Sequence, residues 1–146
     1  MEELIKELDK NLKLDNYTIE ENNIILDVSS ARATAACPFC GKESPYVHSK
    51  YTRSFQDLPI QNKKVKISLA NRKFLCKNLE CSHTTFAERF DFIKHKAKKT
   101  NRLEEEIYNI ANNVSSLTAT SLLNKHTVDI GKSTVFNVLK KRALRK

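Results

Sequence analysis

Hydrophobic residues follow three different rhythms along this chain of 146 residues. Near the N-terminus four of them recur at helical spacing and predict a helix: Leu4, Ile5, Leu8 and Leu12. Two apolar runs, at residues 17–19 and 24–28, flank a polar turn and predict a hairpin. We therefore expect residues 1–36 to form a helix and a hairpin that serve as a packing element.

The second rhythm is a strict alternation in the middle of the chain. Val65, Ile67 and Leu69 alternate with polar or basic neighbours, which predicts a half-buried strand over residues 63–69 with a basic outer face. All four cysteines, all three prolines and eight of the eleven aromatic residues fall between residues 37 and 92. This change of composition favours a separate small β module at residues 37–93, followed by a basic linker at residues 94–101.

The third rhythm is helical again and starts at Arg102. A first helix follows Arg102, a second is expected over residues 118–125 and a third just after Gly131. Their expected inward residues are Leu103, Ile107, Ile110 and Ala111, then Ala119, Leu122 and Leu123, then Val135, Phe136, Val138 and Leu139. The fold class is therefore α+β, with a three-helix domain at residues 102–146.

Composition and charge narrow the class of protein. No run of about 18 apolar residues exists, so no membrane-spanning helix is predicted, and the acidic start is unlike a secretory signal. The net charge of +9 is uneven, because residues 1–36 carry −4, residues 37–90 carry +6 and residues 91–146 carry +7. A polyanion partner, most often nucleic acid, suits the last three quarters of the chain, although solvated lysines give many proteins such a charge.

The four cysteines carry the most specific chemistry. Cys37 and Cys40 form one short loop, and Cys76 and Cys81 form a second one, with 35 residues between Cys40 and Cys76. Two such pairs supply the four soft ligands that Zn²⁺ takes in a tetrahedron, with no open position for a reacting water. The sequence therefore predicts one structural Zn²⁺ held by Cys37, Cys40, Cys76 and Cys81, within a module that resembles a zinc ribbon.

Other interpretations of the cysteines are weaker but stay open. Two disulfides do not suit an intracellular chain, a redox motif needs a helix after the first pair, and an iron–sulfur cluster is a remaining possibility. His83 lies two residues after Cys81 but is expected to be a surface or packing residue. The other histidines, His48, His95 and His126, show no ligand spacing.

The last two predicted helices fit a helix-turn-helix. In such motifs the second helix of the pair enters the major groove, and its N-terminal residues meet base edges. The expected outer face of the helix after Gly131 carries Lys132, Ser133, Thr134, Asn137, Lys140 and Lys141. Asparagine pairs with adenine, and lysine reads guanine or holds phosphate. An ordinary three-helix bundle with a basic face is the alternative.

Basic residues of the middle module are candidates for phosphate contacts. They are Lys63, Lys64, Lys66, Arg72 and Lys73. Together with the last predicted helix they favour double-stranded DNA as the partner, and neither a membrane nor a small-molecule substrate is expected. RNA would use the same basic surface, but the sequence shows no aromatic platform motif.

Four motifs together resemble a known family. They are Cys37-Pro-Phe-Cys-Gly, Arg53-Ser-Phe-Gln-Asp57-Leu-Pro59, Arg72-Lys-Phe-Leu-Cys76 and Cys81-Ser-His-Thr-Thr-Phe86-Ala-Glu88. They look like the N-terminal zinc-binding region of the ISL-three group of bacterial insertion-sequence transposases, in which a helix-turn-helix follows. The resemblance implies binding to the terminal inverted repeats of the transposon.

The same resemblance makes the length of the chain informative. Family members continue into a catalytic domain with an acidic metal-binding triad, whereas this chain ends at Lys146 and its Asp27, Asp57 and Asp91 lie in different modules. We expect a non-catalytic, cytoplasmic and nucleoid-associated protein, either a shortened transposase or a separate DNA-binding derivative such as a transcriptional regulator. The alternative is a protein-interaction module that dimerises, or binds a full-length transposase, through residues 1–36.

Overall fold

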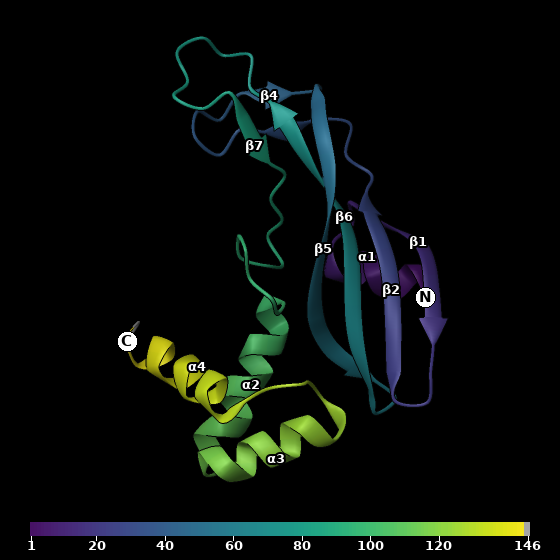
Figure 1. Cartoon of the computed structure of the whole chain (residues 1–146), viewed down its shortest axis with the longest axis vertical. Helices are drawn as coiled ribbons and strands as arrows, with labels where there is room; N and C mark the ends of the chain where they lie inside the picture. Colours follow the sequence, from purple (N-terminus) through teal and green to yellow (C-terminus); the bar gives the residue numbers. More distant parts are fainter. Residues whose placement is uncertain (145–146) are drawn as a thin grey trace.

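The computed structural model describes residues 1–144, without the side chains of residues 116, 126 and 142–144. It has an α+β architecture, in which a mixed sheet stands beside three helices (Figure 1). The helices are α1 (Glu2–Leu8), α2 (Asn101–Asn113), α3 (Ser116–His126) and α4 (Lys132–Leu144). The strands are β1 (Leu12–Ile19), β2 (Asn23–Ser30), β3 (Ala35–Ala36), β4 (Glu43–Ser44), β5 (Val47–Ile60), β6 (Lys63–Leu75) and β7 (Thr85–Ala87).

The main sheet has the strand order β1-β2-β6-β5, and β7 pairs with the far end of β6. Neighbouring strands are antiparallel except β2 and β6, which run parallel. The predicted alternation of Val65, Ile67 and Leu69 is confirmed, because all three are buried in the largest core cluster. The strand that contains them is much longer than residues 63–69 and forms a hairpin with β5.

The N-terminal segment is part of this sheet and not a separate unit. Ile5 of α1 and Leu12 of β1 are buried in the same core cluster as Ile24 of β2 and Val65 of β6. The division expected at residue 36 therefore does not separate two cores. Its physical reason is that the β1–β2 hairpin presents one apolar face, which must be covered, and β6 extends that face through parallel pairing.

The helices α2, α3 and α4 pack around a second core cluster. Its buried members are Leu103, Ile107, Ala111, Ala119, Leu123, Val128, Ile130 and Val135. Two of the expected inward residues are wrong, since Leu122 is 51% exposed and Phe136 is 59% exposed. Each follows or precedes a buried residue by one position, which turns its side chain about 100° away from the core-facing stripe.

The loop between α3 and α4 is fixed by one side chain. The side-chain amide of Asn124 donates to the carbonyl of Ile130 at 2.7 Å, and its oxygen accepts from the Ile130 amide at 3.0 Å. The end of the loop nearest α4 is thereby tied to α3, and α4 begins at Lys132, directly after Gly131 as expected.

The expected linker at residues 94–101 is attached to the sheet. The amide of Gln56 donates to the carbonyl of Lys98 at 2.9 Å, and the amide of Thr100 donates to the carbonyl of Gln56 at 3.0 Å. The guanidinium of Arg53 holds the carbonyls of Lys94 and Ala97 at 2.7 and 3.0 Å. This segment therefore continues the sheet at the free edge of β5, and it fixes where α2 starts.

Asp57 anchors the start of α2 to the sheet. Its buried carboxylate accepts hydrogen bonds from Thr100 at 2.7 Å and from the guanidinium of Arg102 at 2.9 and 2.5 Å. Thr100 is also the N-cap of α2, because its hydroxyl accepts from the amide of Leu103. The hydrogen bond to Asp57 raises the pKa of Arg102, so this guanidinium stays charged beside the carboxylate.

We expect Asp57→Ala to lower the free energy of unfolding by about 2 kcal/mol. The loss of a buried partner costs about 3–5 kcal/mol, and we reduce this value because Arg102 is 42% exposed and water screens its charge. Urea denaturation measures the change. The control is Asp27→Ala on β2, and an equal loss in the two variants would contradict the anchoring role of Asp57.

Candidate metal centre and nucleic-acid interface

The first cysteine pair lies on the loop between β3 and β4. The amide of Cys37 donates to the carbonyl of Lys42, and the amide of Gly41 donates to the carbonyl of Cys37 at 2.7 Å. Gly41 has φ +81°, a left-handed conformation that glycine adopts without strain. The loop therefore closes tightly on itself and turns the Cys37 and Cys40 thiols toward the same point.

The second cysteine pair lies between β6 and β7. The amide of Cys76 donates to the carbonyl of Thr84 at 2.8 Å, and the amide of Cys81 donates to the carbonyl of Asn78 at 3.0 Å. The pairing of β6 with β7 holds the two ends of this loop together. The hydroxyl of Ser44 on β4 donates to the carbonyl of Leu75 at 2.5 Å and links the two cysteine loops.

The four thiols form one cluster with the size of a zinc site. All four sulfur atoms lie within 4.8 Å of one another, with 3.9 Å between Cys37 and Cys81 and 3.6 Å between Cys40 and Cys76. Four sulfurs at the usual Zn–S length of about 2.3 Å lie about 3.8 Å apart at the corners of a tetrahedron. The residues fit one structural Zn²⁺, and the described part of the chain places no fifth ligand in the cluster.

The four cysteine sulfurs need a cation between them if all of them are to be ionised. The hydrogen bond from the backbone amide of Lys42 lowers the pKa of Cys40 to about 6. The backbone amide of Asn78 also lowers the pKa of Cys76, but desolvation and the neighbouring Cys40 sulfur outweigh it and raise that pKa to about 12. Four thiolates cannot ionise together at this distance without a positive charge between them, and a divalent metal supplies it.

Aromatic rings surround the cysteine cluster. Phe74 and Phe86 are buried with Ala35 and Cys37 in a third core cluster, and their rings stack at 5.7 Å. His83 stacks on Phe39 with ring centroids 3.5 Å apart, and it lies outside the cluster of four ligands. Its expected role as a packing residue fits this contact. His48 and His95 are exposed away from the cluster, and the side chain of His126 lies outside the described residues.

A buried ion-pair network joins the cysteine module to the rest of the sheet. Glu88 is 2% exposed, and Arg72 donates to both of its carboxylate oxygens, at 3.0 and 3.2 Å. The hydroxyl of Ser30 donates to Glu88 at 2.7 Å, and Arg32 lies 3.5 Å from it. Arg72 is therefore held by Ser30 of β2 and by Glu88, which directly follows β7, so its guanidinium is already paired within the protein.

The other predicted phosphate contacts divide into held and exposed lysines. Lys64 forms an ion pair with Asp129 at 2.6 Å, and Lys63 donates to the carbonyls of Glu20 and Glu21. Lys66 and Lys73 are exposed and lie on opposite faces of β6. Of the five basic residues proposed for this module, these two are placed best for a partner.

The predicted base-reading residues gather on α4. Lys132, Ser133, Asn137, Lys140 and Lys141 are exposed and Thr134 is half-buried. Thr134, Asn137, Lys140 and Lys141 also line a groove of about 360 Å³ whose other wall includes Lys98, Lys99 and Glu104. The structure thus brings the α4 candidates together with two lysines of the segment at residues 94–101, which the sequence did not place beside them.

The Arg53–Pro59 motif has a structural role that its residue types alone did not reveal. Arg53 binds the segment that precedes α2, and Asp57 binds Arg102 at the start of α2. Gln56 exchanges two hydrogen bonds with the backbone of Asp129, at 2.9 and 3.3 Å. Leu58 packs against the core of α2–α4. The close spacing of Arg53, Gln56 and Asp57 on one strand was the available signal, and it marks the junction between the sheet and the helices.

The cysteine cluster and its two loops define a structural zinc centre of the zinc-ribbon class. Residues 33–81 match the family described as the zinc-finger of transposase IS204/IS1001/IS1096/IS1165. The match takes in all four cysteines and about a third of the chain, so this segment is a transposase-type zinc-binding region that holds one structural Zn²⁺. No curated protein and no solved structure matches the chain. In the described part of the chain, no helix is long and apolar enough to cross a membrane.

Proposed function

We propose that this chain is a zinc-stabilised, sequence-specific protein that binds double-stranded DNA, with the terminal inverted repeats of a transposon as its target. The observation that carries the proposal is the transposase-type zinc region at residues 33–81, joined to a basic helical pair. In this proposal α3 and α4 form a helix-turn-helix, and α4 enters the major groove.

The proposed reading face of α4 combines polar and apolar groups. Asn137 is suited to adenine, and the neighbouring exposed ring of Phe136 is suited to a thymine methyl group. Lys140 and Lys141 then hold phosphates of one DNA strand, and Lys98 and Lys99, across the same groove, hold further phosphates of that DNA strand. Because the ring of Phe136 is exposed, it adds little to the hydrophobic core of the helices, and this supports a role at an interface.

We propose that the chain binds DNA without cutting it. Asp57, the most deeply buried of the three aspartates considered for a catalytic metal, is held by Arg102 and Thr100. Asp27 lies on β2 and Asp91 follows β7, so the three belong to different parts of the fold. As for the alternative of an interaction module, Ile5, Leu8 and Leu12 pack on the chain's own sheet, and we base no dimer proposal on them.

Fluorescence anisotropy with inverted-repeat and scrambled duplexes tests this function. We expect Asn137→Ala to weaken binding to the inverted repeat by about 1–3 kcal/mol and to leave the scrambled duplex unaffected. Lys140→Ala should weaken both and reduce the slope of log K against log salt by about 1. Lys13→Ala, an exposed lysine on β1, is the matched control. Equal binding of the wild type to both duplexes would exclude sequence-specific recognition.

A further inference from the structure

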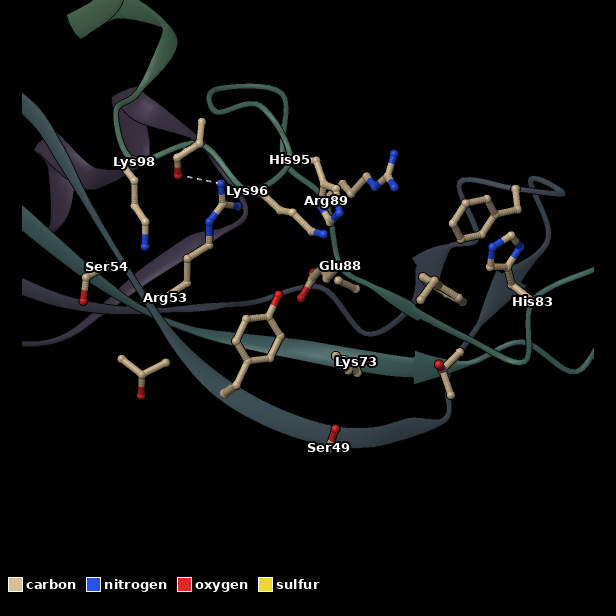
Figure 2. Close-up of a pocket in the computed structure, with 17 residues that line it drawn as sticks. Ser49, Arg53, Ser54, Lys73, His83, Glu88, Arg89, His95, Lys96 and Lys98 are labelled. Carbon is tan, nitrogen blue, oxygen red and sulfur yellow. Dashed lines mark hydrogen bonds between the residues drawn. The ribbon is translucent and has the colours of Figure 1, made fainter. Parts of the chain in front are cut away.

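A larger cleft lies on the sheet, between the zinc centre and the segment that leads to α2. Its volume is about 720 Å³. The floor is formed by residues of β5 and β6, including Ser49, Tyr51 and Lys73, and β7 with the following residues forms the wall. Figure 2 shows Arg89, His95 and Lys96 on one side of the space, with Lys73 and Ser49 on the strands across from them.

The charge of this cleft is strongly positive. Lys73, Arg89, Lys96 and Lys98 are exposed along it, whereas its one carboxylate, Glu88, is buried and paired with Arg72. Desolvation and the charges of Arg89 and Lys96 lower the pKa of His95, which agrees with a positive potential in this space. Such a cleft attracts phosphate groups.

Two aromatic surfaces lie within the same cleft. The ring of Tyr51 is 39% exposed, and the amine of Lys73 lies 5.8 Å from its centroid. At the zinc end, Phe39 stacks on His83, and Arg89 lies 5.7 Å from the Phe39 ring. Cations between exposed rings are the arrangement with which proteins hold single strands, because phosphates follow the cations while bases stack on the rings.

The size of the cleft distinguishes a single strand from a duplex. Its volume lies in the range of pockets for small ligands, about 300–1,000 Å³, and such a space takes only a few nucleotides. The bases of a duplex are already stacked on one another, so a duplex across the mouth would reach the lysines but leave the ring of Tyr51 unused. The rings therefore favour unpaired bases.

We propose that this cleft binds a short single-stranded segment of nucleic acid, with bases on Tyr51 and on the Phe39–His83 stack and phosphates on Lys73, Lys96 and Lys98. The site is additional to the proposed duplex site on α4. Lys98 and Ala97 line both the cleft and the groove beside α4. A strand that separates from a duplex held by α4 can therefore enter the cleft directly.

The test measures anisotropy of fluorescein-labelled dT6 and rU6 with the zinc-loaded full chain. We expect at least one hexamer to bind, with the better one identifying the sugar that the cleft prefers. Tyr51→Ala should weaken that binding about 5- to 150-fold, the range found when a stacking ring is removed, and Tyr51→Phe should keep it. Lys96→Ala should weaken it as well, and melting curves verify that each variant is folded.

Matched variants separate this cleft from the site on α4. Tyr17→Ala removes a tyrosine of similar exposure from β1, outside the cleft, and should leave hexamer binding unchanged. Asn137→Ala should affect duplex binding alone. The proposal is overturned if neither hexamer binds, if Tyr51→Ala weakens binding no more than Tyr17→Ala, or if Tyr51→Ala weakens duplex and hexamer binding equally. The first two of these results are measured on hexamers alone, so they do not depend on whether α4 binds a duplex.

Discussion

Removal of zinc is expected to unfold the end of the molecule that carries the cysteines and to leave the centre of the main sheet folded. Among the described residues, the buried members of the third core cluster are Ala35, Cys37, Phe74 and Phe86, and a core of this size is too small to stay closed alone. The largest cluster, around Ile67 and Leu69, holds no cysteine. Hydrogen exchange should therefore accelerate by at least about 100-fold at residues 35–46 and 74–87 after chelation, because metal binding supplies the folding energy there.

Substitution of single ligands checks the same result. Cys40→Ser and Cys76→Ser should each release zinc and reproduce the pattern of the chelated protein, whereas Lys42→Ser in the same loop should retain the metal. The metal content is measured by atomic absorption and the exchange by mass spectrometry. From the cysteine spacing alone we would expect residues 37–90 to unfold without zinc. Because the middle of this segment belongs to the large core of the main sheet, we now expect only the two cysteine loops and their surroundings to unfold. Unchanged exchange in the zinc-free protein would contradict a structural role for the metal.

Replacement of Glu88 by Ala is expected to cost about 3–5 kcal/mol of the free energy of unfolding. The side chain of Glu88 has no exposed area, and its removal leaves Arg72, 15% exposed, without its charge partner. Ser30 and Arg32 lose the same acceptor, so β2, β6 and β7 separate more easily. Urea denaturation, followed by circular dichroism, measures the loss.

Three further variants show whether charge is the cause. Glu88→Gln keeps the side-chain volume and the hydrogen bond from Ser30, so it should lose less stability than Glu88→Ala. Glu80→Ala removes an exposed carboxylate and should change the free energy of unfolding by less than about 0.5 kcal/mol. The double variant Arg72→Met with Glu88→Leu should recover most of the loss, because apolar pairs often replace buried ion pairs without cost. A double variant as unstable as Glu88→Ala would mean that packing, and not an unpaired charge, explains the effect.

The zinc ligands were predictable because their signal is local. Cys37 with Cys40, and Cys76 with Cys81, are each joined by a short loop whose geometry depends on near neighbours such as Gly41. Tetrahedral coordination then requires only that the two loops meet, and the β5–β6 hairpin between them brings them together. The start of α4 after Gly131 was predictable for the same reason.

The full extent of β5 was not predictable from its pattern. Its first half, with Tyr51 and Arg53, is largely exposed, because this part forms the floor of the cleft and not a core. A strand that faces solvent on both sides shows no alternation of apolar and polar residues. The same limit applies to the parallel pairing of β2 with β6, which depends on residues about 40 positions apart.

The functional candidates on the sheet show what residue type alone does not reveal. Arg72 and Lys64 have the charge of phosphate ligands, but each is neutralised within the protein, by Glu88 and Asp129. Both partners are distant in sequence, so only the fold distinguishes them from Lys66 and Lys73. For α4 the periodicity identified Asn137, Lys140 and Lys141 as exposed, and Phe136 was assigned to the wrong side by one position.

The parallel pairing of β2 with β6 also sets the order of events during synthesis. The β1–β2 hairpin leaves the ribosome with one edge of β2 free, and its partner follows only with residues 64–70. The second cysteine pair arrives later still, so zinc cannot be fully coordinated until residue 81 has been made. Until residues 64–70 have been made, the edge of β2 is open to pairing with other chains, which is a route to aggregation. Nascent chains stalled before residue 64 should therefore depend on chaperones more than the completed protein does.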